Sequence, residues 1–215
     1  MKSPKATRRP GPVENDTLPV GRRATGRVTK QQWLTEALKM FASEGVESVR
    51  ITSLARRLKI SKSGFYWHFE DRNDLLQEMK RFWVDEFTQE IISEVLMSEG
   101  PLKQRLQYLV RTIRERQSGQ YDLAFALWAK RDPEIRDLVD SVWDMRLAFA
   151  RELLADAGFE GVEIEPRARL LLVYFAWSEV MFDPTAGKLK DEPLDEIVNI
   201  LAGPPTNSKI TCPRT

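Results

Sequence analysis

The sequence predicts an all-α protein of about nine helices, with an N-terminal three-helix helix-turn-helix domain and a larger C-terminal helical domain. Two observations predict this fold class. Segments between residues 29 and 203 carry apolar residues at helical spacing, and none shows sustained strand alternation. The two ends, residues 1–28 and 204–215, are rich in proline or polar residues and lack that spacing, so we expect a disordered basic arm and a disordered tail.

Composition excludes several function classes. The 215 residues are 42% hydrophobic and 30% charged, which is ordinary for a globular protein with a real core. The most apolar stretch, residues 170–182, is too short to span a membrane. A single cysteine, Cys212, and a single histidine, His68, cannot build a structural zinc site or an intramolecular disulfide. No phosphate-binding glycine loop or nucleophile motif is present, so we expect no enzyme, no metal and no cofactor. Because the single cysteine gives no intramolecular disulfide, we expect a reducing, cytoplasmic location.

The near-neutral net charge of +1 hides an asymmetry along the chain. Residues 1–80 hold 16 Lys/Arg against 9 Asp/Glu, whereas residues 81–215 hold 17 against 23. This split suggests that the N-terminal part is basic and binds a polyanion, whereas the rest of the chain forms an acidic body. The alternative is that the charge belongs only to the basic arm.

The first helix is expected to begin at a capping box formed by Thr29 and Gln32 and to end at Gly45. Its inward stripe is Trp33, Leu34, Ala37, Leu38 and Phe41. A short second helix follows over residues 53–58, and Lys59-Ile60 forms a tight connector.

The third helix is expected from the N-cap Ser61 to about Phe69. Phe65 and Phe69 lie one turn apart and must face the core, so Ser63 and Trp67 point away from it. Lys62 with Tyr66 lies on one flank, and Gly64 with His68 on the other. A small, basic and aromatic outer face on the second helix of a helix-turn-helix suits a recognition helix in the major groove of DNA.

The remaining helices are placed by their caps and apolar stripes. A long helix capped by Asp71 runs to about residue 98, and further helices are expected near residues 101–119, 122–130, 133–157, 166–183 and 194–201, with Pro101 and Pro133 in first helical positions. The domains are therefore residues 29–71 for DNA binding and 72–203 for the helical body.

Residues 29–80 resemble the DNA-binding domain of the TetR family of bacterial transcriptional regulators. The resemblance rests on the run Ile60-Ser61-Lys62-Ser63-Gly64-Phe65-Tyr66-Trp67-His68-Phe69 and on Arg72, Leu75 and Leu76 after it. It implies DNA contacts for a set of residues on the helix-turn-helix: Thr52, Lys62, Ser63, Gly64, Tyr66, Trp67, His68 and Arg72. Among them, Tyr66, His68 and Arg72 match phosphate-contacting positions.

Two positions depart from the family pattern. Arg50 stands where the family commonly has a capping Thr or Ser, so Thr52 or Ser53 is expected to cap the second helix. Lys59 stands where the family commonly has Gly, and a non-glycine residue in the left-handed region costs about 1 kcal/mol. His68 also has an alternative interpretation, as a packing or capping residue, and Trp67 could be an incidental surface residue.

The resemblance further implies a small-molecule site within the helical body. We take as candidate ligand-binding residues Tyr108, Trp128, Trp143, Arg146 and Trp177. Arg146 interrupts an apolar stripe and so needs a partner, a solvated opening or a ligand. An ion pair between helices is the plain alternative for Arg146.

The C-terminal domain is also expected to form dimers. Residues 170–182 are apolar on every side, so one face can pack on a second subunit, and in the family the last two long helices form that interface. The sequence thus predicts a homodimeric, sequence-specific repressor that reads palindromic double-stranded DNA and is released by a small hydrophobic ligand. The alternative is a DNA-binding regulator without a small-molecule effector, switched by a partner or acting as an activator.

Overall fold

The structure is a computed structural model that describes residues 28–181, 194–201 and 203. Its α-helices are α1 (Lys30–Glu44), α2 (Ile51–Arg57), α3 (Arg72–Val84), α4 (Glu90–Met97), α5 (Leu102–Arg116), α6 (Ser118–Ala129), α7 (Pro133–Asp156), α8 (Ile164–Met181) and α9 (Leu194–Leu201). Shorter helical turns are η1 (Val46–Ser48), η2 (Lys62–Trp67), η3 (Asp85–Gln89) and η4 (Gly161–Glu163). The described part of the chain contains no strand, which confirms the all-α prediction.

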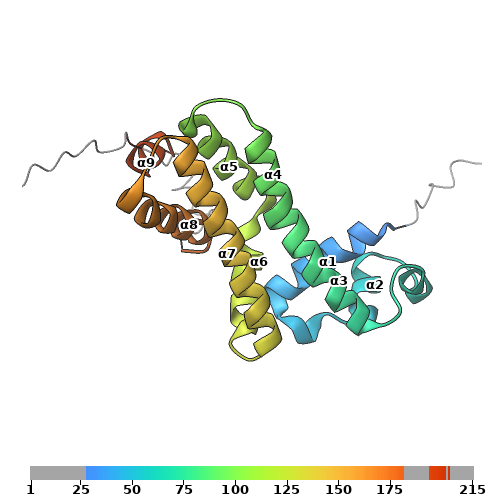
Figure 1. The fold of residues 1–215 in the computed structure, drawn as a ribbon. Coiled ribbons are helices and arrows are strands. Elements are labelled where there is room, and N and C mark those ends of the chain that lie inside the picture. Colours follow the sequence, from blue (N-terminus) through green and yellow to red (C-terminus); the bar gives the residue numbers. More distant parts are fainter. Residues whose placement is uncertain (1–27, 182–193, 202, 204–215) are drawn as a thin grey trace, which may run out of the picture.

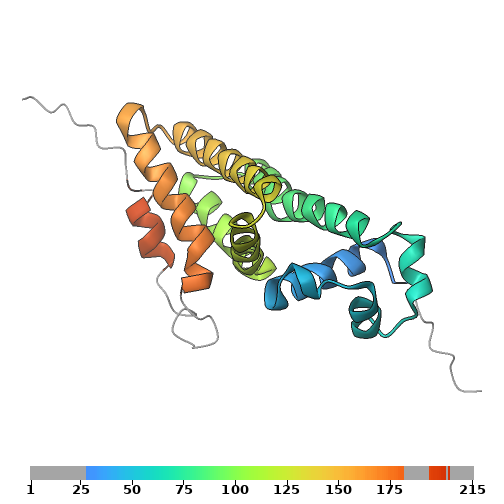
Figure 2. The same ribbon diagram turned by 90° about the horizontal axis from the view of Figure 1, so that it is seen from below.

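The first three helical segments lie at one end of an elongated molecule, and α5, α8 and α9 lie at the other (Figure 1). The rod formed by α3, η3 and α4 connects the two ends, as the view from below also shows (Figure 2). The predicted long helix after Asp71 is therefore present. The π-helical turn η3 within it was not predicted from the sequence.

Helix α1 begins as the sequence predicts. The Gln32 amide donates to the Thr29 hydroxyl at 3.2 Å, and the Thr29 amide donates to the Gln32 side chain at 2.9 Å. The predicted inward stripe from Trp33 to Phe41 is buried. Both bonds join residues only three positions apart, which is why the capping box could be predicted from the sequence.

Helix α2 begins two residues earlier than expected. Arg50, in extended conformation, occupies the N-cap and accepts the Leu54 amide through its carbonyl oxygen, without a side-chain cap. The expectation that Thr52 or Ser53 caps this helix was wrong, because both lie inside it.

The predicted third helix is the 3-10 segment η2, over residues 62–67 only. The Ser61 hydroxyl does not cap it, because the Ser61 and Ser63 oxygens bond each other at 2.7 Å. The amides of Gly64 and His68 instead donate to carbonyls three residues earlier, the pattern of a tighter helix.

Several boundaries in the body also differ from expectation. Pro101 is the N-cap of α5 rather than its first residue, and α6 begins at Ser118 rather than Asp122, directly after a left-handed Gln117. Helix α7 matches, with the Asp132 side chain capping and Pro133 in the first turn. Helix α8 starts two residues before Pro166.

Two clusters of buried side chains hold the molecule together. One joins α1–α3 to α6 and the first half of α7, and the other joins α4, α5, the second half of α7, α8 and α9. In the first cluster the Phe125 ring packs against Phe41 at 4.8 Å and against Trp83 at 4.0 Å between ring centroids. The helix-turn-helix therefore shares its core with α6 of the body.

Candidate nucleic-acid interface and effector cavity

The outer face of the helix-turn-helix has the polarity that the sequence predicts. Phe65 is fully buried, and its ring meets the Trp33 ring edge to face at 5.5 Å. On the opposite side of η2, Tyr66 is 62% exposed and Trp67 is 72% exposed. Thr52, Lys62 and Ser63 are exposed as well. These five predicted contact residues are accessible to a ligand of this face.

Gly64 is half-buried, and the reason for glycine there is not internal crowding. A Cβ atom added at this position would lie 3.5 Å from the Ile60 Cδ1 atom, an ordinary contact distance. Internal packing therefore does not require glycine at this position.

His68 and Arg72 are bonded into the protein itself. The His68 Nε2 atom lies 2.9 Å from the Val28 carbonyl oxygen. The Arg72 Nε and Nη2 atoms each donate at 2.7 Å, to the carbonyls of Val49 and Val46 respectively. Both side chains thus fix neighbouring segments, as the packing interpretation of His68 requires.

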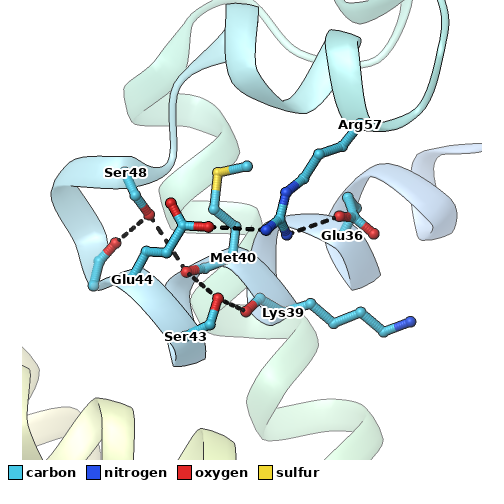
Figure 3. A network of polar contacts seen from close by, with 8 residues as sticks. Glu36, Lys39, Met40, Ser43, Glu44, Ser48 and Arg57 are labelled. Atoms are coloured by element: carbon cyan, nitrogen blue, oxygen red, sulfur yellow. Dashed lines mark hydrogen bonds and ion pairs between the residues drawn. The ribbon is translucent and has the colours of Figure 1, made fainter.

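Helix α2 is tied to α1 by the Arg57 guanidinium, which lies between two carboxylates (Figure 3). The Arg57 Nη1 atom is 3.1 Å from Glu36, and the Nη2 atom is 2.8 Å from Glu44. This network fixes the orientation of α2 relative to α1.

The connector between α2 and η2 contains the strain that the sequence predicts. Lys59 has a φ of 56°, so a non-glycine residue occupies the left-handed region there. The Ile60 amide donates to the Ala55 carbonyl at 3.0 Å and closes the turn.

A cavity of about 70 Å³ lies within the body, between α4, α5, α6, α7 and α8. That volume is several times the roughly 10–15 Å³ that admits one water molecule. Its wall is mostly apolar and includes Ile91, Leu106, Phe149 and Leu171. Mostly apolar walls with a few fixed polar groups are typical of small-molecule sites.

Of the five candidate ligand residues, Arg146 lines this cavity. Trp143 lies behind it, with its ring centroid 5.5 Å from the guanidinium carbon. Trp128 packs on Phe41 in the other core cluster, and the Tyr108 hydroxyl donates to Glu94 near the surface. Trp177 is on α8, but its side chain lies outside the described residues.

Two residues that were not predicted from the sequence, Asp122 and Thr88, join Arg146 in a polar corner of the cavity. The Arg146 Nη1 atom donates to Asp122 at 2.6 Å, and its Nε atom donates to the Thr88 hydroxyl at 3.1 Å. The Trp83 indole donates to the same Asp122 carboxylate at 3.0 Å. Asp122 and Thr88 carry no local sequence signal, because each becomes a partner of Arg146 only through tertiary packing.

The π-helical turn η3 is held by two arginines from other helices. Arg146 donates to the Phe87 carbonyl at 3.1 Å, and Arg116 donates to the Glu86 carbonyl at 2.6 Å. Burial, together with the neighbouring Glu90 carboxyl, raises the pKa of Glu86. Such turns widen the backbone ladder, which leaves carbonyls available to side chains, and they are frequent at functional sites.

Other kinds of site are not found among the described residues. No cluster of three or more His, Cys, Asp or Glu side chains there could hold a metal ion. None of the described helices is both long and apolar enough to cross a membrane.

Residues 34–79 match the family model described as "Bacterial regulatory proteins, tetR family". Residues 34–79 form a TetR-family domain. The TetR-family motif lies on the exposed face of η2, where Lys62, Tyr66 and Trp67 are accessible.

Curated relatives of the TetR-family domain are named as transcriptional regulators. The chain is 35% identical over 51 residues to the HTH-type transcriptional regulator AcrR of Shigella flexneri. It is 28% identical over 86 residues to the probable acrEF/envCD operon repressor of Escherichia coli K12. The matches span 24% and 38% of both this chain and the respective relatives. These names agree with the prediction of a transcriptional regulator rather than an enzyme.

The likeness to solved structures extends over the whole fold. AibR, solved in complex with isovaleryl coenzyme A and operator DNA, has a TM-score of 0.61 to this chain at 21% identity. The alignment covers 81% of this chain and 98% of AibR. The described part of the body therefore shares its fold with AibR.

Proposed function

We propose that this chain is a homodimeric repressor that binds a palindromic operator and is released from it by a small apolar ligand. The observation that carries the proposal is the polar corner of the cavity. There Arg146 is bonded directly to Thr88 and Phe87 of the π turn, within the rod that carries the helix-turn-helix. A ligand that displaces the cavity wall would act on the rod through these bonds.

The rod is long enough to transmit such a displacement. From Arg72 to Met97 it spans roughly 40 Å at 1.5 Å per residue. Its first half packs on α1, and Arg72 at its start bonds the Val46 and Val49 carbonyls of the helix-turn-helix. A shift at η3 therefore changes the orientation of the exposed face.

The DNA partner is supported by the accessible residues of that face. Lys62 supplies a positive charge, and Tyr66 and Trp67 supply a hydroxyl and two aromatic rings. Phosphate contacts would position the protein, and side chains in the major groove would read bases. AibR was solved with operator DNA, which agrees with this proposal. The chain would bind its own operator in the bacterial cytoplasm.

The homodimer is supported by apolar side chains left exposed on the last helices. Leu170 and Val173 on α8 are 58% and 59% exposed, and Ile200 on α9 is 74% exposed. Leu170 and Val173 lie three residues apart, on one face of α8. Burial of this face against a second copy would place two recognition elements on one duplex.

The test begins with selection of bound DNA from a random pool, followed by a thermal-shift screen of apolar compounds. Stabilising compounds are then titrated into the protein–operator complex, where coupling of about 1–3 kcal/mol is expected. Ala150→Leu, which fills the cavity, should abolish the thermal shift and the release from DNA. Ala155→Leu, on the exposed side of the same helix, is the matched control. Stabilising compounds that never alter DNA affinity would favour the regulator without an effector.

A further inference from the structure

The cavity contains one buried hydroxyl without a hydrogen-bond partner. Ser118, the first residue of α6, is 3% exposed and lines the cavity, and its Oγ atom has no partner within the described structure. A buried hydroxyl that bonds neither protein nor water is unfavourable. An occupant of the cavity that carries a hydrogen-bonding group would satisfy it.

The sign of the local electrostatics favours an acceptor on that occupant. Ser118 begins a helix of 12 residues, and its N-cap Gln117 provides no side-chain cap. The positive end of the α6 dipole therefore lies at this point of the cavity wall. An electronegative oxygen beside Ser118 would meet both the hydroxyl donor and the favourable end of the helix.

The charged residues of the wall disfavour an anion. The positive charge of Arg146 is already neutralised, because its two Nη atoms donate to both oxygens of Asp122. Its Nε and Nη2 atoms are further engaged by Thr88 and the Phe87 carbonyl. A carboxylate in this apolar cavity would lose its hydration without gaining an unpaired cation.

We infer that the cavity binds a small apolar molecule carrying one uncharged acceptor oxygen, which the Ser118 hydroxyl bonds. Ketones, esters, amides and thioesters have this chemistry. The inference rests on the proposed function only for the regulatory meaning of the cavity, since binding itself is measured without DNA.

The experiment uses three probes of nearly equal shape on the full-length protein. Acetophenone has a neutral carbonyl, α-methylstyrene replaces that oxygen by a CH₂ group, and benzoate carries a charge. Calorimetry and thermal shift should show acetophenone binding about fivefold more tightly than α-methylstyrene, the effect of roughly one neutral hydrogen bond. Benzoate should bind more weakly than either.

Ser118→Ala isolates the hydroxyl. This variant should bind acetophenone and α-methylstyrene equally and should be at least as stable as the wild type, because the removed group has no partner. Ser141→Ala, whose exposed hydroxyl bonds the Leu138 carbonyl, is the control and should keep the fivefold preference.

The outcomes separate this inference from the proposed function. Failure of all three probes to bind, an acetophenone preference that survives Ser118→Ala, or tighter binding of benzoate overturns the inference. If the preference for acetophenone depends on Ser118 but bound acetophenone leaves operator affinity unchanged, this inference is supported. The same result counts against the ligand-released repressor.

Discussion

Arg146 and Asp122 form a two-point ion pair between α7 and α6, with Nη1 2.6 Å from Oδ2 and Nη2 3.1 Å from Oδ1. The side chains are only 13% and 6% exposed. Since Asp122 also accepts from Trp83, the pair links the cavity wall to the rod. The sequence left open whether Arg146 pairs with another helix, faces an opening or binds a ligand, and the structure shows the ion pair between helices.

Removal of Arg146 should destabilise the fold strongly. Arg146→Met leaves the buried Asp122 carboxylate without its cation, and the free energy of unfolding should fall by about 3 kcal/mol in urea titrations. The double variant Arg146→Met/Asp122→Leu should recover most of this loss. As control, Arg169→Met breaks an exposed pair with Glu165 and should cost less than about 1 kcal/mol. Equal losses of unfolding free energy in Arg146→Met and Arg169→Met would contradict the assignment of Arg146 to a buried ion pair.

Lys59→Gly should stabilise the protein. The residue is exposed and has a φ of 56°, so glycine relieves left-handed strain and should raise the free energy of unfolding by up to about 1 kcal/mol. The melting temperature should rise by a few degrees. Lys39→Gly removes the same charge from the exposed middle of α1 and should have the opposite sign.

Lys62→Ala should reduce the salt dependence of DNA binding. If Lys62 meets a phosphate, the slope of log affinity against log salt concentration falls by about one unit, which fluorescence anisotropy can measure. Lys39→Ala, on α1, is the matched control and should leave the slope unchanged. An unchanged slope with relaxed base preference would instead assign Lys62 to base readout.

The double variant Leu170→Lys/Val173→Lys should convert a dimer into a folded monomer. Both side chains are exposed within one subunit, so their replacement should spare the core while placing charges in the interface. Sedimentation at micromolar concentration measures the mass, and circular dichroism checks the fold. Leu127→Lys, at an exposed apolar position on α6, should remain dimeric. A monomeric wild type would refute the proposed interface.

The Glu165 carboxylate should make stability depend on acid pH. Hydrogen bonds from Arg151 and Arg169 hold its pKa at about 2, below the unfolded value of about 4.3. A carboxyl with a lowered folded pKa stabilises above its unfolded pKa, and this contribution disappears as the pH falls towards 2. The wild type should therefore exceed Glu165→Gln in urea midpoint at pH 6, and the gap should close at low pH. Because the pair is exposed, added salt should narrow the gap too.

The sequence by itself determined the elements whose signals are local. The Thr29–Gln32 capping box and the Asp132–Pro133 start of α7 each depend on a few neighbouring residues, and both are present. The left-handed Lys59 was expected from the family resemblance, and it is present as well. The burial of Phe65 beneath an exposed Trp67 follows from helical spacing in the same way. Local bonds and periodicity can be read without knowing the fold.

Tertiary structure alone decided which side chains meet. Thr88, Asp122 and Arg146 are separated by 24 to 58 positions in the chain, so their cluster depends on how α6 and α7 pack beside the rod. The same packing places the half-buried Trp128 against the first core cluster and the unpartnered Ser118 hydroxyl at the cavity wall. The π turn belongs here as well, since bonds from Arg116 and Arg146 on other helices hold its carbonyls.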